Sequence, residues 1–590
     1  MRRLARAGLI VVVSGALVAG AAPAASASSG SSGSSEDGLG KYGDQKLDWG
    51  SCPFDTVKGA RPAKCALVTV PRDWANPGAG VDLQVSISRV AATGKPADRK
   101  GAVLTNPGGP GGQGTSLAGM IAGLEPKLNK RYAVIGMDPR GTGQEGGTKP
   151  SQLGYQCKVP KSRLPQGPLD ARDRSRHSIR AHLKTPRAIA EACQSDAIAP
   201  YITTWQTAHD MNLIRHLLGE PKLNYLGYSY GTWLGAKFAS LFPHQTGRMV
   251  LDSSVNWEGR LLADFADFPR MDQRQFERIY LPWAVRRFPE VLGPRVKHAK
   301  KSYEKARKAY AKQGESPDNF DALFVGNGSE AQWLISVSVL VAGVTDNDKQ
   351  LQRVLTNAPQ PLRSRLNAVS KQSFGVPTAK LTMHRIIVAN LGQGSRPQDY
   401  LKVPGTRFSV ACGDQHTRGT GYYKRLSDRQ GPRWPLFGWL YGLSEVCGPW
   451  TIPPQHPLPR MPHAVQHKVL VVQGEFDPQT AYEQAMVAVH RAPGVSVLRV
   501  DDAAFHGQYA LRGNPCVDGV INTYLLFGSK TDASLCPTVP LPGEDKVHPV
   551  SGPMHKYPPQ ARTLAASGGS PQLRQHLAQR IARVNAPYVP

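Results

Sequence analysis

A serine framed by two glycines is the feature that most constrains this chain. The stretch from Leu223 to Thr232 reads LNYLGYSYGT, which places Ser229 in the frame Gly-x-Ser-x-Gly. An apolar run precedes the serine, and a helix-like run extends beyond it to Phe242. This order predicts a strand, a sharp turn and a helix, with glycines where strand and helix approach closely. We therefore expect the serine hydroxyl at the edge of a sheet, beside a helix N-terminus that favours negative charge. A glycine-rich turn with an incidental serine is the weaker alternative.

Short apolar runs alternate with helical runs around this serine, which is the pattern of a parallel α/β sheet. The expected strands are residues 102–105, 132–137, 223–226, 248–251, 468–473 and 495–500. The expected helices beside them are residues 208–218, 232–242 and 480–490. The stretch in between is first helical in pattern (265–288, 295–312 and 330–344) and then rich in Pro, Gly and Trp. We predict an α/β fold with a mostly parallel central sheet and a large, mainly helical inserted cap.

These changes in pattern divide the chain. The expected parts are a signal peptide (1–27), a flexible leader (28–44), the first part of the α/β core (45–255), the inserted cap (256–465), the second part of the core (466–554) and a peripheral tail (555–590). The tail contains one short amphipathic helical pattern at residues 572–583.

The first residues have the pattern of an export signal. Met1–Arg6 is basic, Ala7–Ala22 is apolar but too short to span a bilayer, and Ala25–Ala27 is a small-residue cleavage site. The paired arginines leave a twin-arginine export route open. No cysteine follows the apolar core, and no later run is long and apolar enough to span a bilayer. We expect a secreted, extracellular protein without a membrane anchor.

The cysteines agree with export. The sequence has 8 cysteines and neither a Cys-x-x-Cys motif nor a Cys/His spacing typical of a metal site. In an oxidising compartment such cysteines form disulfides. Pairing each cysteine with its neighbour in sequence gives Cys52–Cys65, Cys157–Cys193, Cys412–Cys447 and Cys516–Cys536 as the expected bonds.

The chain is strongly basic, with a formal net charge of +28 and a pI near 9.8. Its Lys and Arg residues are nevertheless spread along the sequence, and no nucleic-acid-binding signature accompanies them. The densest cluster, Arg286–Lys312, is expected to form one basic amphipathic helix. We expect a solvated helix face and no nucleic-acid partner, with attraction to acidic polymers outside the cell as the weaker alternative.

A serine hydroxyl needs a base to remove its proton, and the base needs an acid to hold its tautomer. In the α/β-hydrolase arrangement the chain order is serine, then acid, then histidine. Asp477 follows the expected strand 468–473, and His506 follows the expected strand 495–500. Because carboxyl ends of parallel strands share one sheet edge, we expect Ser229, Asp477 and His506 to form a catalytic triad.

Other acids remain as alternatives. Asp477 precedes Pro478 and would also suit a helix N-cap. Glu475 is the reserve candidate for the acid, and Asp252, after the expected strand 248–251, is a less usual position for it.

A glycine-rich loop, Asn106–Gly112, follows the first expected strand. Such a loop lets a backbone N–H point at a developing oxyanion without side-chain obstruction. We expect the N–H groups of Gly109 and Tyr230 to form the oxyanion hole. The phosphate-binding patterns GxGxxG and GxxxxGK are absent from the sequence, so we expect no nucleotide, and the chemistry needs no cofactor or metal. The turn that begins at Asp138 is expected to be structural, stabilised by Asp138 and Arg140.

At these residues the chain resembles the secreted tripeptidyl aminopeptidases of filamentous bacteria, α/β-hydrolase-fold serine exopeptidases related to proline iminopeptidase. The motifs that carry the resemblance are Asn106–Gly112, Asp138–Gly141, Thr203–Trp205, Asn224–Thr232, Phe242–Pro243, Met249–Asp252, Pro515–Cys516 and Thr523–Leu526. The resemblance implies a triad of Ser229, Asp477 and His506, and removal of tripeptides from free N-termini of peptides or proteins.

The chain departs from proline iminopeptidases at Pro107, where those enzymes carry a histidine. The resemblance is also looser over residues 256–465, where acidic side chains would bind the substrate's ammonium group. Glu258, Asp264 and Asp267 are weak candidates for that role and otherwise solvated helix residues.

The sequence thus predicts an exported serine peptidase that releases short peptides through an acyl-enzyme. A histidine base fails when its imidazole is protonated, so activity is expected to fall through the weakly acidic range. A carboxylesterase of the same fold and an inactive extracellular binding protein are the alternatives. The oligomeric state and the preferred residue at the scissile bond are not indicated.

Overall fold

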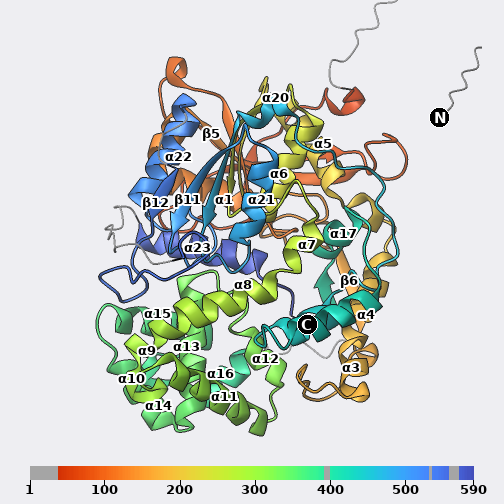
Figure 1. The fold of residues 1–590 in the computed structure, drawn as a ribbon. Coiled ribbons are helices and arrows are strands. Elements are labelled where there is room, and N and C mark those ends of the chain that lie inside the picture. The colour runs from red at the N-terminus through yellow and green to blue at the C-terminus, as the bar shows by residue number, and fades with distance from the viewer. Residues whose placement is uncertain (1–37, 391–398, 530–533, 557–569, 590) are drawn as a thin grey trace, which may run out of the picture. The chain divides into compact units, whose positions relative to one another are not determined.

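A ten-stranded sheet forms the centre of the chain from Lys41 onward (Figure 1). The computed structural model describes residues 38–390, 399–529, 534–556 and 570–589. The expected signal peptide, and the leader up to residue 37, lie outside the described residues. In spatial order the strands are β1 (Gly50–Ser51), β2 (Lys64–Val70), β3 (Leu83–Val90), β5 (Ala133–Asp138), β4 (Ala102–Asn106), β7 (Leu223–Tyr228), β8 (Thr246–Asp252), β10 (Val469–Gly474), β11 (Ser496–Asp501) and β12 (Leu535–Pro537).

The sheet is mostly parallel, as predicted. Strands β1, β2 and β3 are antiparallel to one another, and β3 is antiparallel to β5. From β5 to β12 every neighbouring pair is parallel. A separate antiparallel pair joins β6 (Gln156–Pro160) to β9 (Tyr400–Pro404). The parallel part places the carboxyl ends of β4, β7, β8, β10 and β11 at one edge, which is where the predicted site residues follow.

Helices cover both faces of this sheet, because successive side chains of a strand point to opposite faces. On one face, Leu226 of β7 and Val250 of β8 belong to an apolar cluster shared with three helices, α1 (Thr115–Leu124), α22 (Pro515–Phe527) and α23 (Pro571–Asn585). On the other face, Tyr225 and Leu251 pack against α6 (Tyr230–Leu241), where a Cβ on Gly235 would lie 2.5 Å from the Tyr225 ring. Helices α5 (Thr204–Leu217) and α21 (Tyr482–Arg491) complete the layers.

Helices dominate the stretch expected to be a cap. They are α7 (Leu261–Phe265), α8 (Phe268–Gln275), α9 (Leu281–Arg287), α10 (Pro289–Leu292), α11 (Val296–Lys312), α12 (Pro317–Ala322), α13 (Glu330–Thr345), α14 (Asp348–Thr356), α15 (Leu362–Phe374), α16 (Met383–Asn390), α17 (Thr406–Gly413), α18 (Thr420–Gln430), α19 (Gly438–Ser444) and α20 (His463–Gln466). A π-helical turn, Phe276–Tyr280, links α8 to α9 where one helix was expected. The apolar core of this stretch includes Phe476, which directly precedes Asp477, and Ala504, which lies in the same loop as His506. It therefore packs directly against the loops that follow β10 and β11.

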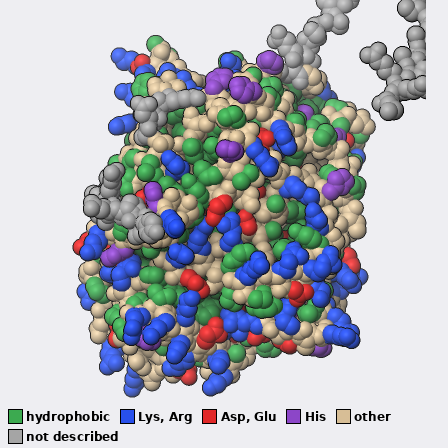
Figure 2. Space-filling view, in the orientation of Figure 1, with side chains coloured by type: hydrophobic (Ala, Val, Ile, Leu, Met, Phe, Trp, Pro, Cys, Tyr) green, Lys and Arg blue, Asp and Glu red, His purple; other side chains and the backbone are tan. Residues whose placement is uncertain are grey.

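The basic cluster Arg286–Lys312 was expected to form one helix. In the structure it is divided between α9, α10 and α11. Helix α11 buries Ala299, Tyr303, Ala306 and Tyr310, a spacing of three and four residues that keeps them on one face. Figure 2 shows Lys and Arg side chains spread over the visible face, with Asp and Glu among them. Among the described residues, no helix combines the length and the apolar character needed to cross a membrane.

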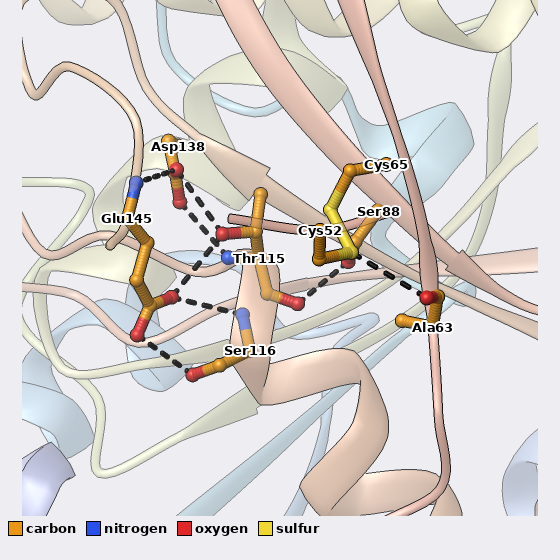
Figure 3. The surroundings of a disulfide bond; sticks show 8 residues. All are labelled: Cys52, Ala63, Cys65, Ser88, Thr115, Ser116, Asp138 and Glu145. Carbon is orange, nitrogen blue, oxygen red and sulfur yellow. Dashed lines mark hydrogen bonds between the residues drawn. A yellow bond between two sulfur atoms is a disulfide. The ribbon is translucent and has the colours of Figure 1, made fainter. Parts of the chain in front are cut away.

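The structure contains the four disulfides expected from the order of the cysteines. They are Cys52–Cys65 (Figure 3), Cys157–Cys193, Cys412–Cys447 and Cys516–Cys536. The second joins β6 to α4 (Lys184–Gln194), and the fourth joins α22 to β12 at the edge of the sheet. Loops of this size stabilise a fold by about 2–4 kcal/mol each in the loop-entropy description.

The turn after β5 is stabilised differently from the expectation. Asp138 accepts hydrogen bonds from the backbone N–H groups of Thr115 (2.9 Å) and Glu145 (2.8 Å), and so fixes the start of α1 (Figure 3). Arg140 does not take part. Its guanidinium forms a bidentate pair with Asp210 of α5, at 2.7 Å from Nε to Oδ2 and 2.5 Å from Nη2 to Oδ1. Both side chains are fully buried, so Arg140 ties the turn to the helix layer instead.

This pair generates a stability prediction. Replacing Asp210 by Asn leaves the buried Arg140 guanidinium without a carboxylate, and loss of one partner of a buried pair costs about 3–5 kcal/mol. The matched control is Asp98→Asn, which breaks the surface pair with Arg131 at 2.7 Å and is expected to cost less than about 1 kcal/mol. Urea unfolding of both variants measures the difference. Equal losses would contradict a special role for the buried pair.

Candidate active site

Ser229 lies in a strained turn between β7 and α6. Its φ of 55° and ψ of −122° are unusual for a residue with a side chain and indicate a conformation imposed by its surroundings. The flanking glycines are sterically required. A Cβ on Gly227 would lie 2.5 Å from the Tyr225 ring, and a Cβ on Gly231 would lie 2.9 Å from Asn106 Oδ1. The structure thus has the predicted strand, turn and helix, with Ser229 buried at the carboxyl edge of the sheet.

Asp477 and His506 are brought together from two loops. Asp477 lies in the turn after β10, and His506 lies in the loop after β11. His506 Nδ1 is 2.9 Å from each carboxylate oxygen of Asp477, and both side chains are fully buried. Asp477 Oδ1 also accepts the backbone N–H groups of Gln479 (2.8 Å) and Thr480 (3.0 Å). Because an ionised carboxylate only accepts, this contact places the imidazole proton on Nδ1 and leaves Nε2 as the basic nitrogen.

The surroundings keep Asp477 ionised. Burial raises the pKa of this carboxyl, but the electrostatic interaction with His506 and the hydrogen bonds from His506 and the Gln479 N–H outweigh it, so the pKa lies below its ordinary value. His506 Nε2 is buried and has no hydrogen-bond partner among the described residues. The described residues include no hydrogen bond between this nitrogen and the Ser229 hydroxyl. A basic nitrogen with a free lone pair is the group that a serine nucleophile requires.

Asp252 connects the serine turn to the histidine loop. Its backbone carbonyl accepts the N–H of Ser229 at 3.0 Å. Its carboxylate accepts the N–H of Gln508 at 3.0 Å and that of Tyr509 at 2.7 Å, and the next residue, Ser253, accepts the N–H of Gly507 at 2.8 Å. Asp252 therefore holds the loop of His506 in place, whereas Asp477 contacts the imidazole.

Glu475, the reserve acid, faces a different environment. Its carboxylate accepts the N–H groups of Met554 (2.8 Å) and Asp502 (3.1 Å), and burial raises its pKa to about 7. Ligand atoms of Glu475, Asp501 and Asp502 lie within 4.8 Å of one another, an arrangement in which acidic groups could hold a cation. None of these contacts reaches His506, so Asp477 is the acid that the structure places beside the imidazole.

The glycine-rich loop differs from the expectation at Gly109. The N–H of Gly109 donates to the side-chain oxygen of Asn585, at the end of α23. Asn585 Nδ2 donates in turn to the carbonyls of Pro107 and Ile581, both at 2.8 Å. The second expected donor, the N–H of Tyr230, is the first of α6 and so has no partner inside its helix. The donor at Gly109 is therefore already occupied in this conformation, by a residue from a segment that the sequence predicted to be peripheral.

The candidate ammonium-binding acids each have a hydrogen-bond partner of their own. Glu258 accepts the N–H of Met461 at 3.0 Å, and Asp267 accepts from Arg270 at 3.0 Å. Asp264 is buried, with Oδ1 accepting the N–H of Asn256 at 3.0 Å and Oδ2 without a partner among the described residues. Within the described part of the chain, no hydrogen bond or ion pair links any of these acids to the serine, aspartate and histidine of the site.

Asp264 generates a pH prediction. Burial raises the pKa of this carboxyl well above its ordinary value of 3.8. The folded state therefore keeps a proton that the unfolded chain releases, and the free energy of unfolding falls as pH rises above the unfolded pKa. Asp264→Asn removes this linkage. Thermal unfolding between pH 4.5 and pH 8 is expected to show the wild type losing stability relative to the variant as pH rises, and parallel curves would contradict it.

The amino-acid sequence of this chain is similar to two protein-family models and to several known hydrolases. Residues 101–316, which include Ser229, match the family model described as the alpha/beta hydrolase fold, and residues 435–536, which include Asp477 and His506, match the one described as TAP-like protein. A tripeptidyl aminopeptidase of Streptomyces lividans is 29% identical over 82% of this chain and 85% of its own length.

Two further relatives come from Mycobacterium tuberculosis. The serine protease Hip1 is 32% identical over 36% of this chain and 40% of its own length. Carboxylesterase B is 26% identical over 82% of this chain and 89% of its own length. The chain is therefore a serine hydrolase of the α/β-hydrolase fold and a homologue of the tripeptidyl aminopeptidases.

Proposed function

We propose that this chain is a secreted serine peptidase that releases short peptides, namely tripeptides, from free N-termini. The observation that carries the proposal is the buried Asp477–His506 pair, with Nε2 of the imidazole unpartnered among the described residues at the sheet edge where Ser229 emerges. The similarity of this chain to a tripeptidyl aminopeptidase along most of both chains supports peptides as the substrate class. Four disulfides and the basic, then apolar, first residues support export to an oxidising compartment.

The reaction follows from the roles of these groups. His506 Nε2 takes the proton of the Ser229 hydroxyl as its oxygen attacks the carbonyl carbon of the scissile peptide bond. Asp477 stabilises the imidazolium, and backbone N–H groups, with Tyr230 first among them, hold the oxyanion. The imidazolium then returns the proton to the leaving amine, which breaks the C–N bond and leaves an acyl-enzyme on Ser229. Water, activated by the same imidazole, releases the N-terminal fragment and restores the serine.

A carboxylesterase activity is the second candidate, favoured by the similarity to carboxylesterase B along most of both chains. Both reactions use the same groups, so the substrate decides between them. A peptidase of the proposed type needs the free ammonium group, whereas an esterase needs only an ester carbonyl.

The substrate prediction follows. A chromogenic tripeptide amide with a free amine is expected to be cleaved, and its N-acetylated form to be cleaved at least about tenfold more slowly, since one lost charged contact is worth at least 1.4 kcal/mol. Mass spectrometry of fragments from a mixed peptide set gives the length released. Equal cleavage of both amides, or cleavage of esters alone, would exclude the aminopeptidase.

The roles of the triad give a separate prediction. Ser229→Ala is expected to abolish labelling by a fluorophosphonate. Asp477→Asn is expected to lower kcat by about 10⁴-fold, because the imidazole loses the acceptor that fixes its tautomer. Glu475→Gln is the matched control, since Glu475 is a nearby buried carboxyl that bonds to Met554 and Asp502 and not to His506. A comparable loss in the control would contradict the assignment of Asp477.

A further inference from the structure

The end of helix α23 lies at the loops that carry the candidate triad. Ile581 approaches Gly507, where a Cβ would lie 3.6 Å from its Cγ2 atom. The carbonyl of Ala582 accepts a hydrogen bond of 2.8 Å from the side chain of Gln479, which follows Asp477 by two residues. Upstream, Leu573, Leu577 and Ile581 belong to the apolar layer beside the sheet. The helix is thus anchored upstream on the core, and its last turn contacts the loops of Asp477 and His506.

Asn585 is the residue of this turn that reaches the glycine-rich loop. Its carboxamide is buried, with Oδ1 accepting from Gly109 and Nδ2 donating to Pro107 and Ile581. A Cβ on the neighbouring glycine, Gly108, would clash both with Asn585 Oδ1 and with the carbonyl of Tyr228, 2.5 Å away. Tyr228 directly precedes Ser229, so the amide oxygen of Asn585 lies beside the serine turn.

The residues after Asn585 continue this contact away from the sheet. Pro587 packs against Gly326, because a Cβ added to Gly326 would lie 2.5 Å from the proline ring. Tyr588 lies edge-to-face on Phe408, with ring centroids 5.2 Å apart. The carbonyl of Val584 accepts a weak hydrogen bond of 3.4 Å from Arg407. The segment 585–589 therefore runs from the glycine-rich loop to Gly326, between α12 and α13, and to α17.

The site is closed in this conformation. Relative exposures are 5% for Ser229 and 0% for Asp477 and His506, so little of these three residues is open to solvent in this conformation. A cleft of about 610 Å³ borders the last turn of α23 and is lined by Gly111, Arg583 and Val584 among others. The last turn of α23 is therefore bordered by space on part of its surface.

We propose that Asn585, with the residues that follow it to Val589, is an intramolecular stopper of the active site. The amide oxygen of Asn585 is chemically the same acceptor as the carbonyl oxygen of a peptide bond, and it occupies the N–H of Gly109 that the substrate oxygen needs. Hydrolysis therefore requires the end of α23 to withdraw and release this donor. The inference rests on the proposed function, because it takes Gly109 as an oxyanion donor.

Only molecules in which the stopper is withdrawn can react. The observed rate is therefore the rate of the open site multiplied by the fraction of molecules in that state. Asn585→Ala removes the acceptor of the Gly109 N–H and the donation to Pro107. Loss of even one of these buried hydrogen bonds, at ordinary strength, shifts such an equilibrium by about three- to tenfold. We expect the rate at which a fluorophosphonate labels Ser229, and kcat/KM for a free-amine tripeptide amide, to rise by that factor in the full chain.

Asn585→Asp separates the stopper from a merely supporting role. Aspartate keeps an oxygen that accepts from Gly109 but loses the two donations to Pro107 and Ile581. As a stopper it is expected to label no faster than the wild type, whereas loss of loop support would make it resemble Asn585→Ala. Arg583→Ala is the matched control on the same turn, because Arg583 is exposed and makes no hydrogen bond or ion pair within the described residues. It is expected to label at the wild-type rate.

Tyr588→Ala is a second variant that leaves Asn585 intact. It removes the contact with Phe408 that holds the segment down, so labelling is expected to rise here as well, with unfolding temperatures checked for every variant. Labelling of the wild type at a rate that neither Asn585→Ala nor Tyr588→Ala increases would overturn the stopper and leave the proposed function standing. Absence of labelling in the wild type and in every variant would overturn the proposed function itself, and the stopper with it.

Discussion

Asp252 is the residue on which the geometry of the site depends. It is the last residue of β8, paired in register with Tyr228 at the end of β7, and its carbonyl accepts the N–H of Ser229. Its buried carboxylate accepts two successive N–H groups of the loop that carries His506. One residue therefore sets the spacing between a strained turn and a loop from a distant part of the chain. Parallel strands make this possible, because their carboxyl ends lie side by side although their sequences are far apart.

The helical stretch between β8 and β10 packs on the loops of Asp477 and His506, which the sheet alone does not cover. Its apolar core includes Phe476 and Ala504, so the residues beside Asp477 and His506 are packed from above as well as from the sheet. Burial alone would raise the pKa of Asp477, and the imidazole and backbone N–H groups more than offset that effect. The result is a carboxylate that stays charged in a dry environment, where its hold on the histidine is stronger than it would be in water.

The sequence predicted those features of the fold that depend on residues close together in the chain. The strand, turn and helix around Ser229, the late strands and the order of Asp477 and His506 follow from spacing, and the cysteine pairs follow from neighbours in sequence. Strands β2 and β3 were missed, because antiparallel strands near a sheet edge mix exposed and buried residues and lack the continuous apolar run of a central parallel strand. The pair of Arg140 with Asp210, and that of Gly109 with Asn585, were missed for another reason. Each joins segments whose sequences carry no sign of the other, and only the folded layers bring them together.

The hydrogen bond from Gly109 to Asn585 also has a physical reason that does not depend on the proposed stopper. A backbone N–H that points into a buried site is unfavourable without an acceptor, by about 1–3 kcal/mol. The amide oxygen of Asn585 removes that cost in the resting protein. In the proposed mechanism, the substrate's amide carbonyl replaces that of Asn585 at the same N–H, so the exchange is close to neutral in hydrogen-bond energy. The donor then gains its advantage only as the substrate oxygen becomes an oxyanion, since a charged acceptor binds an N–H more strongly than a neutral amide does. The proposed stopper must leave the N–H before either the substrate or the transition state can use it, so it lowers kcat/KM, and the stronger hydrogen bond to the charged oxyanion offsets more of that cost than the bond to the neutral substrate does.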